Sequence, residues 1–331
     1  MPAEWVPHAR TWMCWPCRGE AWGGAEGMLR AKQAHARVAR AISSFEPVTM
    51  AVRPQDHCEA KLACAGRVEF FEAPLDDSWS RDSGPTFLVG REGARAGVQW
   101  RFNAWGGKYR DYGEDAKFAT RVLQDRHLSI YRAPFVCEGG AIHVDGEGTL
   151  ITTEQCLLNP NRNPGLTQQQ IENGLAQFTG ASKVIWLGQG FADEETDGHV
   201  DNIACFAAAG RVLVGVPAST SHPDHAPVRE AIRRLKVARD AQGRELEVIE
   251  VEQPQGERTD WRGRLLASSY INFYLPTGGV VMPAFDDPND EKARAALAHC
   301  FPDRDILQVD ALDIVQGGGG IHCITQQEPA P

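Results

Sequence analysis

The sequence contains no long uninterrupted apolar run and no excess of basic residues. No segment is apolar over the length that a membrane-spanning helix needs, and the first residues lack the basic and apolar regions of a secretory leader. We therefore expect a cytoplasmic protein that does not enter the membrane. The formal net charge of −10 argues against a nucleic acid as partner and favours a cationic small molecule.

Cysteine occurs nine times, but the spacings typical of disulfide or metal sites are scarce. An odd number excludes a complete disulfide framework and favours a reducing compartment. Cys14 and Cys17 form a Cys-x-x-Cys pair, but there is neither a second such pair nor a His-x-x-x-His to complete a zinc site. We interpret both cysteines as packed among neighbouring tryptophans, and we expect no metal.

A run of four glycines precedes one cysteine near the C-terminus. Residues 316–327 read Gln-Gly-Gly-Gly-Gly-Ile-His-Cys-Ile-Thr-Gln-Gln. Glycine permits positive φ and close approach of the backbone to a ligand, and the apolar Ile321 and Ile324 predict a buried strand around Cys323. The alternative is a glycine turn followed by an ordinary buried cysteine. Reactive partners elsewhere in the chain decide between the two interpretations.

Strand-like apolar runs alternate with amphipathic segments along the chain. The apolar spacing predicts helices at 28–45, 168–178, 228–238 and 291–300. This alternation predicts an α/β protein of repeated small units, arranged either as a ring around a central site or as a conventional two-layer sheet. No linker divides the chain, so we expect a single domain over residues 1–331. Strands are expected at 48–52, 68–71, 86–89, 139–144, 149–153, 183–187, 199–206, 212–216, 247–251, 268–275, 280–283, 306–309 and 319–325.

Polar segments at 79–85, 138–140 and 194–202 supply an imidazole and several carboxylates to accompany the thiol of Cys323. A cysteine attacks as the thiolate, which a neighbouring imidazolium stabilises, and His199 is the candidate. His199 and Asp201 alternate, so on a strand both side chains would lie on one face.

A second carboxylate in such a site indicates a cationic substrate. A planar guanidinium presents paired N–H donors that match carboxylates in bidentate geometry. Asp82 and Asp201 would hold this group, stabilise its charge and position its central carbon near the thiol of Cys323.

Several blocks of this sequence together resemble the agmatine deiminases, and the similarity runs essentially from end to end. The resemblance implies the pentein fold, an α/β-propeller of five ββαβ-like units with a central active-site channel. It also implies hydrolysis of agmatine to N-carbamoylputrescine and ammonia, without metal or organic cofactor, by an enzyme that often forms homodimers. The blocks are residues 1–5, 77–85, 102–107, 138–140, 156–164, 197–202, 269–274 and 321–327.

The same resemblance assigns catalytic roles to individual residues. It implies that Cys323 is the nucleophile, His199 the acid and base, and Glu138 the carboxylate that hydrogen-bonds His199. Asp82 and Asp201 correspond to the pair that holds the guanidinium.

The resemblance also suggests residues at the entrance of the site. Trp79 is a candidate wall for the aliphatic part of agmatine, and a purely structural role beside a turn is the alternative. An acidic residue of the segment 193–195, for which we choose Glu194, would meet the distal ammonium; an ordinary solvated acidic loop is the alternative. We leave Trp105 out of the predicted site.

Two positions depart from the pattern of this family. Gly320 stands where many relatives have asparagine, and Asp197 stands where relatives often have asparagine. We expect Gly320→Asn to retain or improve activity, because an amide can fix the loop before Cys323. An inward-pointing Asp197 would raise the pKa of His199.

Other functions fit parts of the pattern. A deiminase of another guanidine, such as peptidyl-arginine, would use the same reactive residues. Free arginine fits less well, because no arginine is assigned to its carboxylate. A non-catalytic polyamine-binding protein has no need for the thiol, and a cysteine peptidase needs an oxyanion donor more than two carboxylates.

Overall fold

Five small sheets follow one another along the chain in a computed structural model that describes residues 1–192 and 195–331. Three of the sheets repeat one pattern, in which two strands pair antiparallel and a third strand, reached through a helix, adds in parallel, and the other two vary it. In the second unit β4 (Thr86–Val89) pairs antiparallel with β5 (Arg95–Arg101). Helix α5 (Phe118–Asp125) then leads to β6 (Ser129–Val136), which lies parallel to β5.

The next two units repeat this order without additions. The third consists of β7 (Ile142–Val144), β8 (Thr149–Thr153), α7 (Gln168–Thr179) and β9 (Lys183–Leu187). The fourth consists of β10 (Ala204–Ala208), β11 (Arg211–Val216), α8 (His225–Val237) and β12 (Glu247–Glu252).

The fifth unit has a reduced first strand. Strand β13 (Gly279–Ala284), α9 (Asp290–Cys300) and β14 (Asp305–Asp310) form its parallel pair. A single antiparallel bridge between Tyr274 and Val281 takes the place of the first strand. Short α10 (Leu312–Val315) follows β14.

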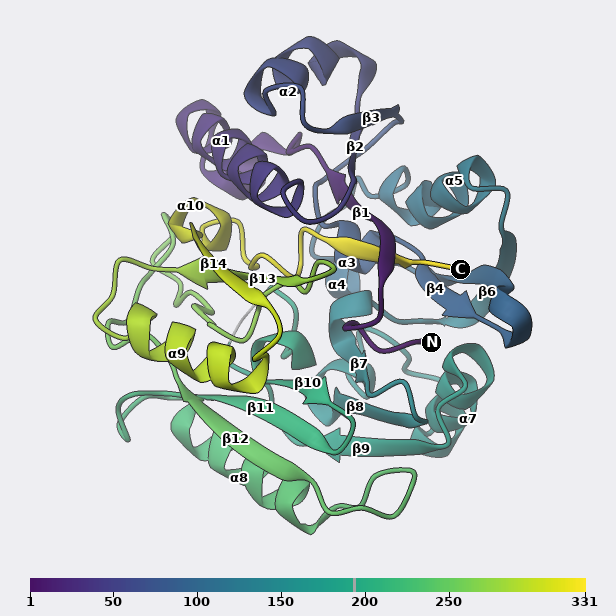
Figure 1. The fold of residues 1–331 in the computed structure, drawn as a ribbon, viewed down its shortest axis with the longest axis vertical. Coiled ribbons are helices and arrows are strands. Elements are labelled where there is room, and N and C mark those ends of the chain that lie inside the picture. Colours follow the sequence, from purple (N-terminus) through teal and green to yellow (C-terminus); the bar gives the residue numbers. More distant parts are fainter. Residues whose placement is uncertain (193–194) are drawn as a thin grey trace.

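The first unit is assembled from both ends of the chain. Strand β15 (Gln326–Pro329) pairs antiparallel with β1 (His8–Cys14), and α1 (Ala25–Ile42) leads to β2 (Val48–Val52), parallel to β1. Helix α2 (His57–Ala63) and β3 (Glu69–Glu72) extend this sheet. The C-terminal strand thereby closes a ring of five units, with both termini on the same side of the view in Figure 1. The predicted ring is confirmed, and the two-layer sheet is wrong.

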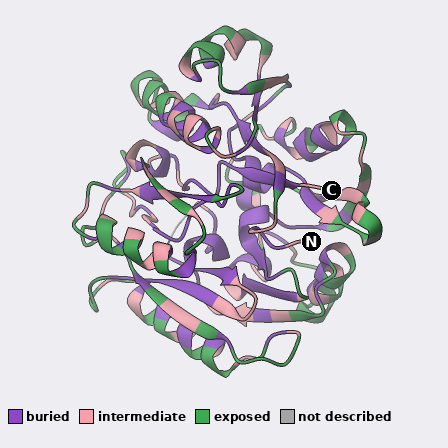
Figure 2. Ribbon diagram, in the orientation of Figure 1, coloured by how far each residue is buried: buried purple, intermediate pink, exposed green. Residues whose placement is uncertain are grey.

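The residues near the centre of the ring are the most buried, and exposure increases toward the outer helices (Figure 2). Residues of β2 and β8 are buried on both faces, whereas the helices bury one stripe, such as Val228, Ala231, Ile232 and Leu235 of α8. Figure 2 shows buried residues gathered at the centre and exposed residues on the outer helices. Within the described part of the chain, no helix has the length and apolarity to cross a membrane.

Two strands expected near the polar segments, at 268–275 and 319–325, are wrong, and the strand expected at 199–206 is present only from Ala204, as β10. Residues 200–202 form a 3-10 turn before β10 begins, 268–275 is irregular apart from its one bridge, and 321–324 is a turn ahead of β15. The apolar residues of these segments are buried, as those of a strand would be, but the backbone hydrogen-bonds to site residues and not to a neighbouring strand. The backbone N–H of His322, for example, donates to Asn272 Oδ1 at 3.0 Å.

Candidate active site

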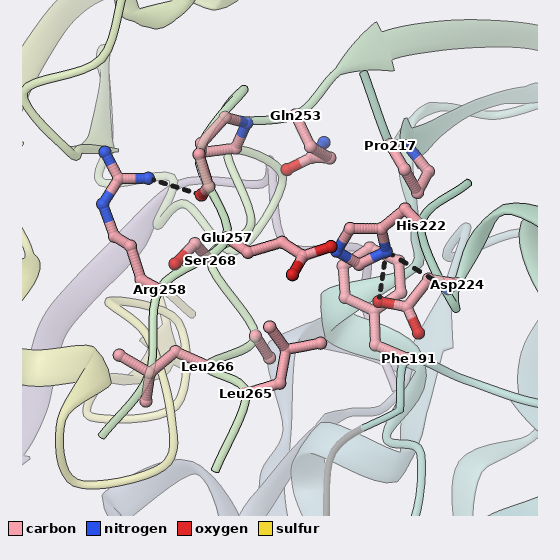
Figure 3. A pocket seen from close by; sticks show the side chains of 13 residues that line it. Phe191, Pro217, His222, Asp224, Gln253, Glu257, Arg258, Leu265, Leu266 and Ser268 are labelled. Atoms are coloured by element: carbon pink, nitrogen blue, oxygen red, sulfur yellow. Dashed lines mark hydrogen bonds and ion pairs between the residues drawn. The ribbon is translucent and has the colours of Figure 1, made fainter. Parts of the chain in front are cut away.

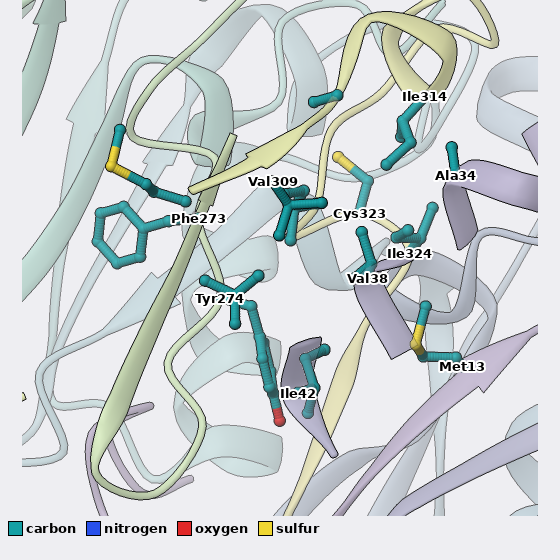
Figure 4. Packing of buried hydrophobic residues seen from close by; sticks show 14 of the residues in the cluster. Met13, Ala34, Val38, Ile42, Phe273, Tyr274, Val309, Ile314, Cys323 and Ile324 are labelled. Atoms are coloured by element: carbon teal, nitrogen blue, oxygen red, sulfur yellow. The ribbon is translucent and has the colours of Figure 1, made fainter. Parts of the chain in front are cut away.

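Cys323 lies in a buried turn that the apolar core holds from behind. Its side chain is 4% exposed and belongs to the cluster that contains Ile314, Ile321 and Ile324. Figure 4 shows it among these apolar side chains and those of α1. The backbone O of Cys323 accepts from the N–H of Arg81 at 3.1 Å, which joins this turn to the segment that carries Asp82.

The glycine run before Cys323 lets three side chains close in. A Cβ at Gly319 would lie 2.6 Å from the ring of Trp79 and 3.2 Å from the sulfur of Cys323, so only glycine fits between them. Gly318 has φ of +99°, in the left-handed region. The close backbone approach predicted from the sequence is therefore present, although it occurs in a turn and not in a strand.

A narrow pocket leads to Cys323. The space inside it, counted with its open mouth, is about 290 Å³. It is lined by Trp79, Asp82, Trp105, Tyr109, Glu195, Thr196, Gly317, Gly318, Gly319 and Cys323.

Asp82, Asp201 and His199 converge on the backbone of Gly140. A Cβ at Gly140 would lie 2.6 Å from His199 Nδ1 and 3.0 Å from a carboxylate oxygen of each aspartate. Asp82 is in short α3 (Ser80–Ser83), and its two oxygens accept from Gly140 N at 2.9 Å and Trp105 Nε1 at 2.8 Å. Burial raises the pKa of Asp82, as does the charge of Asp201, although His199 opposes them. A cation is therefore favoured here.

Asp201 offers one free oxygen to this site. Its Oδ2 accepts from His322 Nδ1 at 2.9 Å and from the thiol of Cys323 at 3.4 Å. Its Oδ1 is buried and has no hydrogen-bond partner among the residues that the structure describes. Burial opposes ionisation, but His322 and His199 lower the pKa of Asp201. A buried, charged and unpartnered acceptor fits a cationic donor.

His199 lies between two carboxylates without a close hydrogen bond. Its Nδ1 is 3.8 Å from Asp82 Oδ1 and its Nε2 is 3.8 Å from Glu138 Oε2. Within the described ranges neither ring nitrogen has a hydrogen-bond partner. Burial favours the neutral ring, but Asp82, Cys156 and Glu138 raise the pKa of His199 well above its usual value. The ring is therefore an imidazolium near neutral pH.

Glu138 is itself held by a buried arginine. Arg162 Nε donates to Glu138 Oε1 at 2.7 Å, and both side chains are fully buried. Burial opposes ionisation of Glu138, but Arg162 and His199 lower its pKa. Glu138 is thus a fixed negative charge beside His199, at an ion-pair distance and not in the hydrogen bond that the resemblance implies.

Burial and two neighbouring carboxylates favour the protonated thiol of Cys323. Burial and the charges of Asp201 and Asp82 raise its pKa well above the usual value. The backbone N–H of Gly320 and the amide of Asn272, 3.4 Å from the sulfur, act in the opposite direction. A cation that binds between the aspartates removes the main electrostatic obstacle to forming the thiolate.

The entrance residues predicted from the sequence have different outcomes. Trp79 lines the pocket and stacks on Trp22, with ring centroids 5.7 Å apart. Glu194 lies outside the described residues. Its neighbour Glu195 lines the pocket, but its carboxylate already bonds Arg264 and, at 3.3 Å, the hydroxyl of Tyr109.

Sequence reasoning missed four polar groups of this site. Trp105, which we left out, bonds Asp82 and lines the pocket. Arg162 and Asn272 lie in sequence blocks that resemble the agmatine deiminases, and His322 directly precedes Cys323. A polar residue inside an apolar stretch was the available signal for Asn272 and His322, but their partners are remote in sequence.

Asp197 points away from His199. Its φ of +57° directs its carboxylate to Lys108 at 3.0 Å, Asn161 at 2.9 Å and Arg162 at 2.7 Å. The inward orientation that would raise the pKa of His199 is therefore absent.

The structure reverses our expectation for Gly320→Asn. A Cβ at Gly320 would collide with the amide of Asn272, which is buried and bonded to the backbone N–H of His322 and to Asn202. We now expect Gly320→Asn to lose about 1–3 kcal/mol of unfolding free energy, as overpacked cores do, and to turn over more slowly. Urea unfolding and steady-state kinetics measure both effects.

Gly165→Asn is the matched control, because a Cβ at Gly165 meets nothing within 4 Å. Wild-type stability and turnover in a Gly320→Asn variant would show that Asn272 moves aside without cost.

A second pocket of about 390 Å³ lies beside the residue pair His222 and Asp224. Figure 3 shows His222, Asp224, Glu257 and Arg258 around it. Asp224 accepts from Ala192 N at 2.5 Å, and His222 Nδ1 from Asp224 N at 3.2 Å. No cysteine lines it, so we place the chemistry in the pocket of Cys323.

The five-unit ring with its central pocket defines the chain as a pentein. An amidinotransferase from Microseira wollei shares this fold, with a TM-score of 0.57, 12% identity, and coverage of 100% of this chain and 96% of that one. A sequence profile of the Porphyromonas-type peptidyl-arginine deiminases matches residues 1–329. The chain belongs to this family.

Curated relatives and a solved structure resemble the chain over nearly its whole length. A putative agmatine deiminase of Legionella pneumophila is 48% identical over 99% of this chain and 94% of that protein. The agmatine deiminase of Stutzerimonas stutzeri is 43% identical over 100% and 95%. The solved agmatine deiminase of Enterococcus faecalis has a TM-score of 0.96 at 37% identity, covering 100% of this chain and 95% of that one.

Proposed function

We propose that this protein is an agmatine deiminase, which hydrolyses agmatine to N-carbamoylputrescine and ammonia. The observation that carries the proposal is the buried carboxylate of Asp201, whose Oδ2 lies 3.4 Å from the thiol of Cys323 and whose Oδ1 has no hydrogen-bond partner among the described residues. The similarity to curated agmatine deiminases over the full chain supports the same substrate. We also propose a cytoplasmic location, which the absence of any disulfide among the nine cysteines of the structure supports.

The first half of the reaction forms a covalent intermediate. The guanidinium donates to Asp201 and Asp82, and its positive charge lowers the pKa of Cys323, whose proton leaves to solvent. The thiolate attacks the guanidinium carbon and forms a tetrahedral adduct. A C–N bond then breaks as His199 gives its proton to the departing ammonia, leaving an amidino-thioether on Cys323.

The second half releases the product. His199, now neutral, takes a proton from a water molecule that attacks the same carbon. The C–S bond then breaks, the hydroxyl proton of the adduct leaves to solvent as the C=O bond forms, and the ureido product departs with the thiolate of Cys323 restored. Glu138 acts throughout by keeping a negative charge 3.8 Å from His199, and Arg162 keeps Glu138 ionised and fixed.

The pocket favours a slender substrate. Trp79 and Trp105 are buried aromatic walls on which a methylene chain packs. Among the described residues, the lining contains no lysine or arginine, so the α-carboxylate of free arginine finds no cationic partner in that part of the pocket. Glu195 is already paired with Arg264, and we retain Glu194 as the proposed partner of the distal ammonium.

Peptidyl-arginine is the rival substrate, because the name of the family specifies it and the reactive residues would be the same. Purified protein incubated separately with agmatine, arginine and a peptidyl-arginine distinguishes them by ammonia release and product mass. We expect ammonia and N-carbamoylputrescine from agmatine alone. Ammonia from the peptide alone would overturn the substrate, and silence with all three would favour a non-catalytic polyamine-binding protein.

A further inference from the structure

A chain of buried charges runs from Asp201 away from the pocket to the N-terminal segment. Asp201 Oδ2 accepts from His322 Nδ1 at 2.9 Å. His322 Nε2 lies 3.0 Å and 3.1 Å from the two carboxylate oxygens of Glu4, which is separated from it by 318 positions in the sequence. Glu4 Oε1 also accepts from Arg81 NH1 at 3.1 Å. Ring closure alone brings these residues together.

His322 has a carboxylate at each ring nitrogen. Ionised carboxylates only accept hydrogen bonds, so both ring nitrogens must carry a proton. Burial and the nearby Arg81 act against this, but Glu4 and Asp201 raise the pKa of His322. The side chain is therefore an imidazolium that is shared between the two anions.

Glu4 is anchored from several sides. It is 4% exposed, and His143 Nε2 lies 3.6 Å from its Oε2 in addition to the contacts with His322 and Arg81. Burial opposes its ionisation, but these three partners lower the pKa of Glu4 well below the usual value. A fixed negative charge thus holds the far side of the imidazolium.

We propose that Glu4 and His322 are positioning residues that orient Asp201 and, through it, the nucleophile Cys323. His322 and the thiol of Cys323 both contact Oδ2 of Asp201, which leaves Oδ1 free to accept a hydrogen bond from the substrate. The inference rests on the proposed function, in which Asp201 binds the guanidinium. It makes the N-terminal segment part of the reactive site, although Glu4 does not line the pocket.

The arrangement explains how Asp201 remains charged. Asp82 and the thiol of Cys323 face Asp201 from α3 and from the turn at 321–324, and two neighbouring anions in a buried site raise each other's pKa. His199 and His322 supply the opposite charge from either side. Arg81 and His143 face Glu4 at the far end.

Two substitutions test the chain of charges at different points. Glu4→Gln preserves the shape and one acceptor but removes the charge. His322→Asn places an amide N–H close to the position of Nδ1, so it keeps a donor for Asp201 and loses the contact with Glu4. His322→Leu removes both contacts.

Glu328→Gln is the matched control. Glu328 is fully buried and accepts from Arg95 at 2.8 Å, Arg126 at 3.1 Å and Trp12 at 2.9 Å, but no contact joins it to Asp201 within the described residues. We expect this variant to lose thermal stability and to keep wild-type kinetics.

The readouts are kcat and KM with agmatine, the melting temperature, and the rate at which iodoacetamide alkylates Cys323 without substrate, followed by peptide mass spectrometry from pH 6 to 10. We expect Glu4→Gln to lower kcat/KM by about 10²-fold, the cost of a small misplacement at a reacting centre, with part of the loss in KM. We expect alkylation at a fixed pH below the thiol pKa to slow about tenfold, equivalent to one unit in that pKa. His322→Asn should retain more activity than His322→Leu.

Wild-type kcat/KM and alkylation in folded Glu4→Gln and His322→Asn variants would overturn the proposal. A lower melting temperature with unchanged kinetics in these variants would also overturn it. So would equal losses of activity in His322→Asn and His322→Leu. If wild-type protein releases no ammonia from agmatine while alkylation slows in the Glu4 and His322 variants and not in Glu328→Gln, the proposed function fails and the positioning role stands.

Discussion

Replacing Cys323 by alanine is expected to reduce ammonia release from agmatine by at least about 10⁴-fold, because the covalent intermediate cannot form without the sulfur. The change should leave the fold intact, since alanine is smaller and the turn at 321–324 is held by backbone bonds to Arg81 and Asn272. Ammonia release and circular dichroism measure the two properties.

Cys300→Ala is the control for the loss of a buried thiol. Cys300 is 5% exposed, lies at the end of α9 and does not line the pocket of Cys323. The Cys300→Ala variant should keep the wild-type rate of ammonia release. A Cys323→Ala variant that releases ammonia at more than about one hundredth of the wild-type rate would contradict nucleophilic attack by this sulfur, given the loss expected for a covalent catalyst.

His199→Asn is expected to lower kcat by about 10²–10⁴-fold, the usual contribution of a general acid and base. In the wild-type enzyme, Asp82, Cys156 and Glu138 raise the pKa of His199 well above 6.5 despite its burial. The imidazolium that protonates ammonia is therefore present below that pKa and disappears as the pH rises through it. The kcat of the wild-type enzyme should fall on the alkaline side.

The pH profile of His199→Asn separates this role from a structural one. Its residual rate should lack the alkaline fall that the imidazolium causes in the wild type. An unchanged alkaline limb in the variant would assign that limb to another group and remove His199 as the acid.

The sequence predicts four of the outer helices and most of the strands, misses α2, α5, β5 and β6, and fails near the site. Helix α8 and strand β9 have regular apolar spacing, because one face packs on the core and the other meets water or a neighbour. Residues 199–203 and 319–325 also look like strands, but they are buried turns, and β10 begins only at Ala204. Burial and pairing produce the same apolar pattern, so the sequence cannot separate them.

The unpredicted β1 shows a second limit. Its sequence, His-Ala-Arg-Thr-Trp-Met-Cys, mixes polar and apolar residues because polar partners come from remote segments. Trp12 donates to Glu328, which is 316 positions away, and Thr11 donates to Glu46. Glu328 reaches Trp12 only after the C-terminal strand has closed the ring.

The reactive residues could be predicted from the sequence through their chemistry and the resemblance to a family. The residues that hold them in place could not. The structure brings Cys323, Asp82, Asp201 and His199 around one point beside Gly140 and the pocket. Arg162 behind Glu138 and Glu4 behind His322 emerge only from distances across units. These contacts set the charges on which the proposed reaction depends.

The most direct test of covalent catalysis by Cys323 is the mass of the protein after acid quenching during turnover of agmatine. We expect an adduct with the mass of agmatine less one ammonia. It should be located on the peptide that carries Cys323 and be absent from the Cys323→Ala variant. The adduct should accumulate to a higher level in His199→Asn wherever the attack of Cys323 still proceeds, because that variant lacks the base that activates water in the second half of the reaction. Turnover of agmatine with no adduct on Cys323 in either the wild type or His199→Asn would contradict the covalent mechanism.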